Sequence, residues 1–175
     1  LNMPVYQAYA YSYPHKTAYR AFDQPVDLTP AWQQEKLDAL FLYVHIPFCT
    51  MRCGFCNLFT LLKPGQDLPD RYLDALERQI GVLSAIISQA QFARYAIGGG
   101  TPTFLSVSQL ERLFDLTDFV HAGASPGIRV PVGIECSPET VTVEKIQLLE
   151  SRGVTRISMG VQSFTELEIK NLVRR

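Results

Sequence analysis

The chain has 175 residues, of which 47% are hydrophobic, and its 16 basic and 17 acidic side chains leave a formal net charge of −1. This balance produces no strong field that would attract nucleic acid or an anionic membrane. The aromatic content of 11% excludes a disordered chain, and no apolar run approaches the ~20 residues of a membrane-spanning helix. We therefore expect a soluble, cytoplasmic protein that binds neither nucleic acid nor membranes.

The beginning of the chain differs in composition from the rest. Residues 1–38 are rich in tyrosine and proline and lack a clear hydrophobic period, which predicts an irregular arm lying over a larger body. The chain starts with Leu1 rather than Met and stops inside an amphipathic pattern. We therefore expect a piece of a longer protein, with residues 39–175 forming the N-terminal, incomplete part of an α/β domain.

Strand-like and helix-like segments alternate after this arm. Apolar runs of strand length occupy 41–48, 93–97, 127–135 and 154–161, and each is followed by a helical pattern, at 68–89, 110–120, 137–153 and after residue 163. Such alternation predicts a parallel sheet with helices packed outside. The runs are nearly continuous in apolar residues, as expected of strands covered on both faces. An open doubly wound sheet and a (β/α) barrel both fit this pattern.

Local signals mark several element boundaries. Ser106 and Gln109 have the spacing of a capping box at the start of the second helix. Ser137 is the predicted cap of the third helix, and Gly153 is its predicted stop. Pro131 weakens the third strand or marks an irregularity in it.

Polar and unusual residues gather after the predicted strands. A cysteine cluster follows the first strand, a glycine run follows the second, Glu135 ends the third, and Gln162 follows the fourth. In α/β folds the loops at the carboxyl ends of the strands form the ligand site. We therefore expect these four segments to meet at one site.

The cysteine cluster consists of Cys49, Cys53 and Cys56 in the pattern C-x-x-x-C-x-x-C. A disulfide scaffold would spread its cysteines along the chain, so clustered thiols favour a metal site. Three thiolates can hold three irons of a [4Fe–4S] cluster and leave the fourth iron open to a ligand. A structural zinc site with His45 as the fourth ligand, or ordinary buried thiols, are the alternatives.

The glycine run lies in the sequence IGGGTPT, residues 97–103. It lacks the lysine of a phosphate-binding loop and is not G-x-G-x-x-G. Glycines at a strand end allow positive φ and expose backbone groups, which favours contact with the amino or carboxylate group of a ligand. A tight turn without a ligand is the alternative.

Three further residues are candidates for polar ligand contacts. Glu135 ends an apolar strand, where a lone carboxylate is costly unless it meets a cation or hydroxyl groups; pairing with Arg129 or Arg156 is its alternative. Gln162 and Arg174 could hold a second polar group of the ligand, such as a carboxylate, to which the guanidinium of Arg174 can donate several hydrogen bonds. A solvent-exposed helix face is the alternative for Arg174.

Together these motifs resemble the radical S-adenosylmethionine (SAM) enzymes, whose signature is C-x-x-x-C-x-x-C after the first barrel strand. The sequences YVHIPFC, RCGFC, GGGTPT and RISMGVQSF are most similar to the branch that contains oxygen-independent coproporphyrinogen III oxidase, haem chaperones and some radical methylases. The resemblance extends from about Phe41 to the last residue.

The resemblance implies a fold and a reaction. The fold would be part of an incomplete (βα)6 radical SAM barrel, with about four βα units present and truncated at the C-terminus. The cofactors would be a [4Fe–4S] cluster and SAM. The reduced cluster would pass one electron to SAM, which would then be cleaved to a 5′-deoxyadenosyl radical. This radical would abstract hydrogen from the substrate. A small molecule, such as a porphyrinogen or haem, would be the substrate, and flavodoxin or ferredoxin would donate the electron.

The resemblance also implies roles for individual residues, with Cys49, Cys53 and Cys56 as the cluster ligands. The implied SAM contacts are Tyr43, Phe55, Gly99, Gly100, Thr101, Glu135, Gln162 and Arg174. No residue is assigned a catalytic role. One departure is Leu58, because the decarboxylating oxidases have a fourth cysteine at this position. Leu58 therefore favours a haem chaperone or a radical methylase as alternatives to porphyrinogen oxidation.

Overall fold

The computed structural model describes residues 19–54, 56, 58–122 and 129–171. In chain order the elements are α1 (Leu28–Trp32), β1 (Leu40–Ile46), β2 (Phe48–Cys49), β3 (Leu61–Leu62), α2 (Leu68–Ile86), β4 (Phe92–Gly99), the 3-10 helix η2 (Pro102–Phe104), α3 (Val107–Thr117), the 3-10 helix η3 (Asp118–His121), β5 (Val132–Cys136), α4 (Val143–Ser151), β6 (Val154–Met159) and α5 (Glu166–Asn171). Across these described ranges, no helix combines the length and apolarity needed to cross a membrane.

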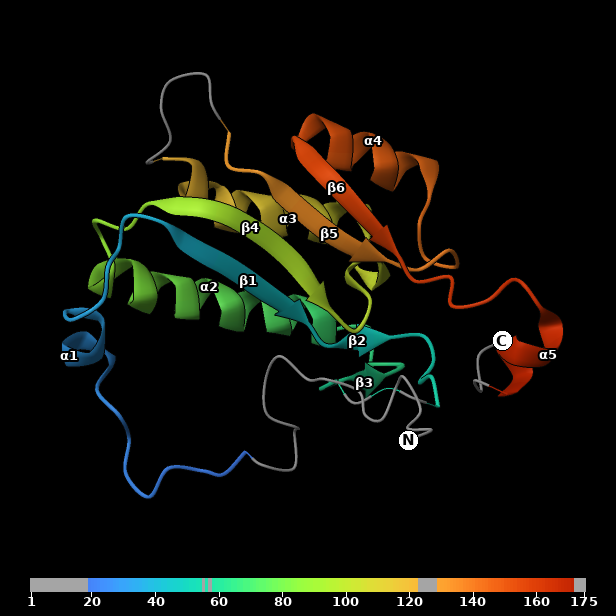
Figure 1. Ribbon diagram of the computed structural model, residues 1–175, viewed down its shortest axis with the longest axis horizontal. Coiled ribbons are helices and arrows are strands. Elements are labelled where there is room, and N and C mark those ends of the chain that lie inside the picture. The colour runs from blue at the N-terminus through green and yellow to red at the C-terminus, as the bar shows by residue number, and fades with distance from the viewer. Residues whose placement is uncertain (1–18, 55, 57, 123–128, 172–175) are drawn as a thin grey trace, which may run out of the picture.

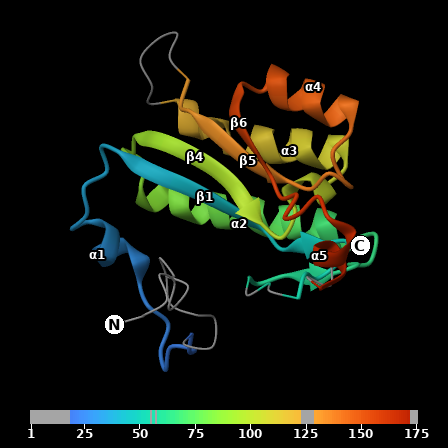
Figure 2. The same ribbon diagram turned by 45° about the vertical axis from the view of Figure 1, so that its right-hand side comes forward.

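The main sheet has four parallel strands in the order β1-β4-β5-β6, so that each strand lies beside the next one along the chain. The helices α2, α3 and α4 lie on one side of this sheet (Figures 1 and 2). A doubly wound sheet reverses its strand order and has helices on both faces. Sequential order with helices on one side is instead the winding of a (β/α) barrel. The structure therefore resolves the two alternatives in favour of part of a barrel.

The hydrophobic core lies between the sheet and these helices. Strand residues such as Ile46, Ile97 and Ile134 are at most 2% exposed, and they pack against Leu110 of α3 and Leu149 of α4. Full burial of each such side chain contributes about 1.5–3 kcal/mol. This apolar layer fixes the strands in register and thereby fixes where their carboxyl ends lie.

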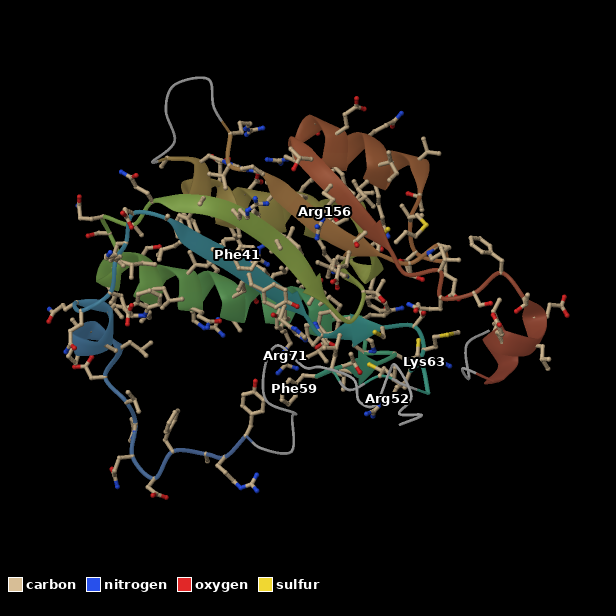
Figure 3. The ribbon with its side chains drawn as sticks, viewed as in Figure 1. Phe41, Arg52, Phe59, Lys63, Arg71 and Arg156 are labelled. Atoms are coloured by element: carbon tan, nitrogen blue, oxygen red, sulfur yellow. The ribbon has the colours of Figure 1, made fainter. Side chains whose placement is uncertain are left out.

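The opposite face of the sheet carries no helix, and here the sequence-based prediction of strands covered on both faces is wrong for the described residues. On this open face the exposed fraction of Phe41 is 60% and that of Tyr43 is 48%. Figure 3 shows Phe41 and Arg156 on this side of the sheet, projecting from β1 and β6. In a barrel this face is the interior, which is enclosed only where the sheet closes on itself. In β1, Phe41 and Tyr43 on this face alternate with Leu42 and Val44 on the core face, which gives this strand its nearly continuous apolar pattern.

The predicted capping box of α3 is confirmed. The Ser106 hydroxyl accepts a hydrogen bond from the Gln109 backbone N–H at 3.2 Å, and the Gln109 side chain accepts one from the Ser106 N–H at 3.0 Å. Gly153 follows α4 with φ of +74°, which is the predicted helix stop. β5 begins directly after Pro131 rather than at 127.

The predicted start of α4 is wrong. Thr142, not Ser137, caps this helix, because its hydroxyl accepts a hydrogen bond from the Lys145 N–H at 3.3 Å. Ser137 is instead buried after β5, where its N–H donates to the Thr103 hydroxyl at 3.4 Å. A tertiary contact between two loops thus takes the place of the predicted helix cap.

The described part of the predicted arm also contains regular structure. Residues 28–32 form α1, and the Asp27 carboxylate caps this helix by accepting from the Thr29 N–H at 2.9 Å. The prediction of an irregular segment is therefore incomplete, because a single short turn of helix leaves no period in the sequence.

Candidate cofactor site

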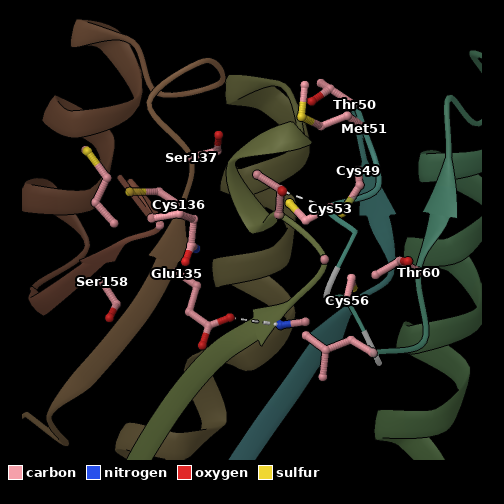
Figure 4. Close-up of a pocket in the computed structure, with 17 residues that line it drawn as sticks. Cys49, Thr50, Met51, Cys53, Cys56, Thr60, Glu135, Cys136, Ser137 and Ser158 are labelled. Carbon is pink, nitrogen blue, oxygen red and sulfur yellow. Dashed lines mark hydrogen bonds between the residues drawn. The ribbon is translucent and has the colours of Figure 1, made fainter. Parts of the chain in front are cut away.

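A cavity of about 290 Å³ lies at the carboxyl ends of the four strands. Figure 4 shows that segments far apart in the sequence line it. The cysteine loop, the glycine loop, the end of β5 and the segment after β6 all contribute. The lining residues are Cys49, Thr50, Met51, Cys53, Cys56, Leu58, Thr60, Gly99, Gly100, Thr101, Glu135, Cys136, Ser137, Ser158, Met159, Gly160 and Gln162. The structure thus brings together the four segments that the sequence analysis singled out.

The three clustered thiols belong to one short loop on the wall of this cavity. Cys49 ends β2, and the backbone N–H of Cys56 donates to the Cys53 carbonyl at 3.0 Å, which closes the loop. All three cysteines are partly exposed. Among the described residues no three His, Cys, Asp or Glu side chains are grouped tightly enough to hold a single metal ion. A [4Fe–4S] cluster places each thiolate on a different iron, so this donor set around one cavity fits it.

His45 is not available as a fourth metal ligand. Its Nε2 lies 2.8 Å from the Phe59 carbonyl oxygen, and its Nδ1 lies 3.4 Å from the Tyr43 hydroxyl. Because a carbonyl only accepts, Nε2 carries a proton, and Nδ1 shares a hydrogen bond with the Tyr43 hydroxyl. Both ring nitrogens are thus engaged, and the structure does not support the zinc site with His45.

The glycine loop packs directly on the cysteine loop. A Cβ at Gly100 would lie 2.6 Å from the Phe48 carbonyl oxygen and 2.8 Å from the Cys49 sulfur. Gly99 has φ of +114°, a conformation that side chains rarely adopt. The Cys49 sulfur also lies 3.6 Å from the Thr101 hydroxyl. Gly100 therefore allows the first cysteine to approach the end of β4, whereas Gly99 leaves room for the His45 ring.

The backbone N–H groups of the glycine loop are already paired. Gly100 donates to the Ile46 carbonyl and Thr101 to the Phe48 carbonyl, both at 2.8 Å, and Gly99 donates to Glu135 at 3.2 Å. A carboxylate ligand needs donors, whereas an ammonium group needs acceptors. Of the two ligand groups expected at this loop, the structure therefore favours the amino group.

Glu135 points from β5 toward the glycine loop. Its carboxylate accepts the Gly99 N–H bond (Figure 4), and both Glu135 Oε2 and the Tyr43 hydroxyl lie 3.0 Å from the position that a Cβ of Gly98 would take. Arg129 instead pairs with Asp118, at 3.9 Å. In the described part of the chain no ion pair joins Glu135 to either of the two predicted arginine partners.

Gln162 also lines the cavity, and its backbone has φ of +71°. A non-glycine residue in this region carries a conformational cost of about 1–3 kcal/mol, and such strain concentrates at functional sites. The two remaining candidates, Phe55 and Arg174, lie outside the described residues.

A lysine that no sequence pattern marks joins two loops beside the cavity. The half-buried Lys145 ammonium donates to the backbone carbonyls of Thr103, at 2.6 Å, and Thr140, at 2.9 Å. The hydroxyls of these threonines are 2.7 Å apart. Burial lowers the pKa of Lys145 from its ordinary value. No sequence signal marks Lys145, because lysine is common on exposed helix faces.

Replacing Lys145 with methionine should lower the free energy of unfolding by about 1–3 kcal/mol, because the Thr103 and Thr140 carbonyls lose a charged donor. Urea denaturation measures this change. Lys36→Met, at an exposed position, is the control and should stay within about 0.5 kcal/mol of the parent protein. Equal stability of the two variants would contradict the role given to Lys145.

Cys136 is the fourth cysteine of the chain and does not belong to the loop. It is 6% exposed at the end of β5, and burial raises the pKa of its thiol. A raised thiol pKa opposes the thiolate form that binds metals. Its burial and its position outside the cysteine loop therefore argue against a ligand role for Cys136.

Known proteins are similar to this chain in sequence and in fold. The Radical SAM superfamily is matched by residues 43–175. The oxygen-independent coproporphyrinogen III oxidase of Salmonella typhimurium is 33% identical over 181 residues, which cover 99% of this chain and 38% of the relative. The heme chaperone HemW of Bacillus subtilis is 36% identical over 124 residues, which cover 71% of this chain and 32% of the relative.

Among solved structures, coproporphyrinogen III oxidase (HemN) from Escherichia coli, described as a radical SAM enzyme, superposes with a TM-score of 0.69 at 30% identity. The match covers 80% of this chain and 31% of that chain. The chain therefore spans between about 31% and 38% of the length of these relatives. With the superfamily matched over most of its length and the corresponding fold observed, the chain belongs to the radical SAM superfamily.

Proposed function

We propose that this chain forms the cofactor-binding part of a radical SAM enzyme. The observation that carries the proposal is that three cysteines of one loop and the glycine loop line a single cavity. A [4Fe–4S] cluster and SAM bound there would supply the chemistry, a one-electron reductive cleavage that yields a 5′-deoxyadenosyl radical. The reduction needs an electron donor, for which we propose a flavodoxin or ferredoxin in the cytoplasm.

In this proposal the residues of the chain hold and orient the cofactors. Cys49, Cys53 and Cys56 bind the cluster, and Gly99, Gly100 and Thr101 shape the loop that receives the SAM amino group. Glu135 supplies an acceptor beside this loop, since its carboxylate already lies against the Gly99 N–H. The remaining proposed SAM contacts are Tyr43, Phe55, Gln162 and Arg174.

The named candidate reaction is oxidation of porphyrinogen propionate groups, because the relatives include coproporphyrinogen III oxidases. A haem chaperone is the second candidate, since two HemW proteins are 36% and 33% identical to this chain over 71% and 79% of its length. One residue favours the second candidate. Leu58 lines the cavity at the position where the resemblance implies a fourth cysteine in the decarboxylating oxidases. A radical methylase acting on another substrate is the third candidate.

Anaerobic reconstitution of the intact protein with iron and sulfide tests the proposal. After reduction and addition of SAM, we expect the broad absorbance of a [4Fe–4S] cluster and formation of 5′-deoxyadenosine. Stoichiometric zinc without cluster absorbance would overturn the proposal.

The same preparation separates the candidate reactions. Vinyl formation from coproporphyrinogen III would establish the oxidase. Haem binding together with SAM cleavage, but without vinyl formation, would establish the chaperone. SAM cleavage with neither outcome would leave the methylase.

A further inference from the structure

The open face of the sheet carries two arginines that lie nearer the amino ends of the strands than the cofactor cavity does. Arg94 on β4 and Arg156 on β6 are both exposed. Arg94 lies in register with Phe41, whose side chain is on the open face, and the neighbouring Tyr95 points the other way to bond Thr117 of α3. Strand residues alternate between faces, so Arg94 projects from the open side.

Arg156 lies on the same face. Its Nε is 3.7 Å from the position that a Cβ of Gly133 would take, so the side chain extends over β5. Figure 3 shows Arg156 and Phe41 on this helix-free side. Arg156 is in register with Gly133, which is in register with Ala96. With strands about 4.8 Å apart and a rise of about 3.3 Å per residue, the Cα atoms of Arg94 and Arg156 are separated by about 12 Å.

Neither guanidinium has a hydrogen bond or an ion pair with any residue in the described ranges. The acid on this face, Glu135, is occupied with the Gly99 N–H. Unpaired charges in a barrel interior are costly once the sheet closes and excludes water. The two arginines therefore fit an anion that enters this interior.

The surface between the arginines suits a flat apolar body. Ala96 on β4 and Gly133 on β5 are small, partly exposed residues in register with each other, and they leave a shallow floor, which ends at Gly98 because Tyr43 and Glu135 cover that residue. The aromatic side chains of Phe41 and Tyr43 border this floor on β1. A ring system can thus lie on the floor against an aromatic wall, with its acidic groups beside the arginines.

We infer that Arg94 and Arg156 form a carboxylate-binding subsite that holds the acid side chains of a tetrapyrrole on the open face. The inference rests on the proposed function, which supplies the ring system. The two arginines of this chain carry the charge opposite to that of the ring's acid groups, and guanidinium groups bind carboxylates through paired hydrogen bonds. The subsite would place the ring just below the cavity where the radical forms.

Binding to the intact protein without cluster or SAM tests this subsite separately from SAM cleavage. The probes are coproporphyrin III, a fluorescent tetracarboxylate, and its uncharged tetramethyl ester, both in the same dilute detergent. The variants Arg94→Gln and Arg156→Gln should each weaken binding of the acid by about tenfold or more, while binding of the ester should not change. Arg78→Gln, which removes an exposed charge from α2 on the other side of the sheet, is the control and should bind like the parent.

Three results would overturn the subsite. These are unchanged acid binding in both variants, an equal loss for acid and ester, and no binding of the acid by the parent protein. Arg156→Lys keeps the positive charge but lacks the paired N–H donors of a guanidinium group, so it should restore part of the affinity that Arg156→Gln loses. Haem, with two propionates, should show the same dependence if the protein is a chaperone. SAM cleavage by the reconstituted Arg94→Gln protein would show that the proposed function stands even where the subsite fails.

Discussion

Replacing Cys53 with alanine should abolish the [4Fe–4S] absorbance of the reconstituted protein and all formation of 5′-deoxyadenosine. The expected loss is complete, because two thiolates cannot replace the three that hold a cluster with one open iron. The free energy of unfolding of the unreconstituted protein should change by less than about 1 kcal/mol, since Cys53 lies partly exposed in a loop. Iron and sulfide analysis, absorbance spectra and urea denaturation measure the three quantities.

Cys136→Ala provides the matched control for this experiment. Cys136 is buried at the end of β5 and is not part of the cysteine loop. This variant should keep its cluster and its SAM cleavage, although it loses some packing. An intact cluster in Cys53→Ala would refute the ligand assignment, and loss of the cluster in Cys136→Ala would show that the fourth cysteine takes part.

Replacing Gly100 with alanine should damage both stability and cluster binding. The added Cβ would meet the Phe48 carbonyl oxygen at 2.6 Å and the Cys49 sulfur at 2.8 Å. The first of these is backbone and cannot swing away, so the strand end and the cysteine loop must move apart. Overpacking of this kind costs roughly 1–3 kcal/mol. Reconstitution should also yield less cluster per chain, because Cys49 is displaced from its place beside Thr101.

Gly81→Ala is the control for the same chemical change. Gly81 lies in α2, and a Cβ there would meet no atom within 4 Å. Alanine in an exposed helix interior is favoured over glycine by about 0.5–1 kcal/mol, so this variant should gain stability and keep its cluster. Urea denaturation measures the free energy of unfolding of both variants, and iron analysis measures their cluster content. Parent-like stability in Gly100→Ala would contradict the close packing of the two loops.

Some features of the site follow from the order of residues along the chain. The alternation of apolar runs and helical patterns predicts parallel strands, and parallel strands bring their carboxyl ends to one edge. The positions of Cys49, Gly99 and Glu135 directly after or at such ends are therefore sufficient to place them near one another. The sequence does not reveal how they touch, because these contacts join residues 36 or more positions apart, such as Gly99 and Glu135.

Other features could not be predicted from the sequence, and the reasons are physical. The covering of only one sheet face depends on the side of the sheet to which each helix returns, and hydrophobic period alone does not encode this choice. Ser137 carries the chemistry of a helix cap, yet its burial against Thr103 decides its place. Lys145 has the pattern of a surface lysine, and only the packing of two loops turns it into a half-buried donor to two backbone carbonyls.

The sequence by itself determined the order of the four main strands and of the helices between them, the cysteine pattern, and the strand ends at which the candidate ligand-binding residues lie, because these depend on local periodicity and spacing. Tertiary structure alone decided that the sheet winds as a barrel with an open inner face, and that the N–H groups of the glycine loop are already paired. It also decided that His45 is engaged with Tyr43 and Phe59 rather than free for a metal. These outcomes depend on which distant groups compete for each donor and acceptor, and that competition is settled only when the chain is packed.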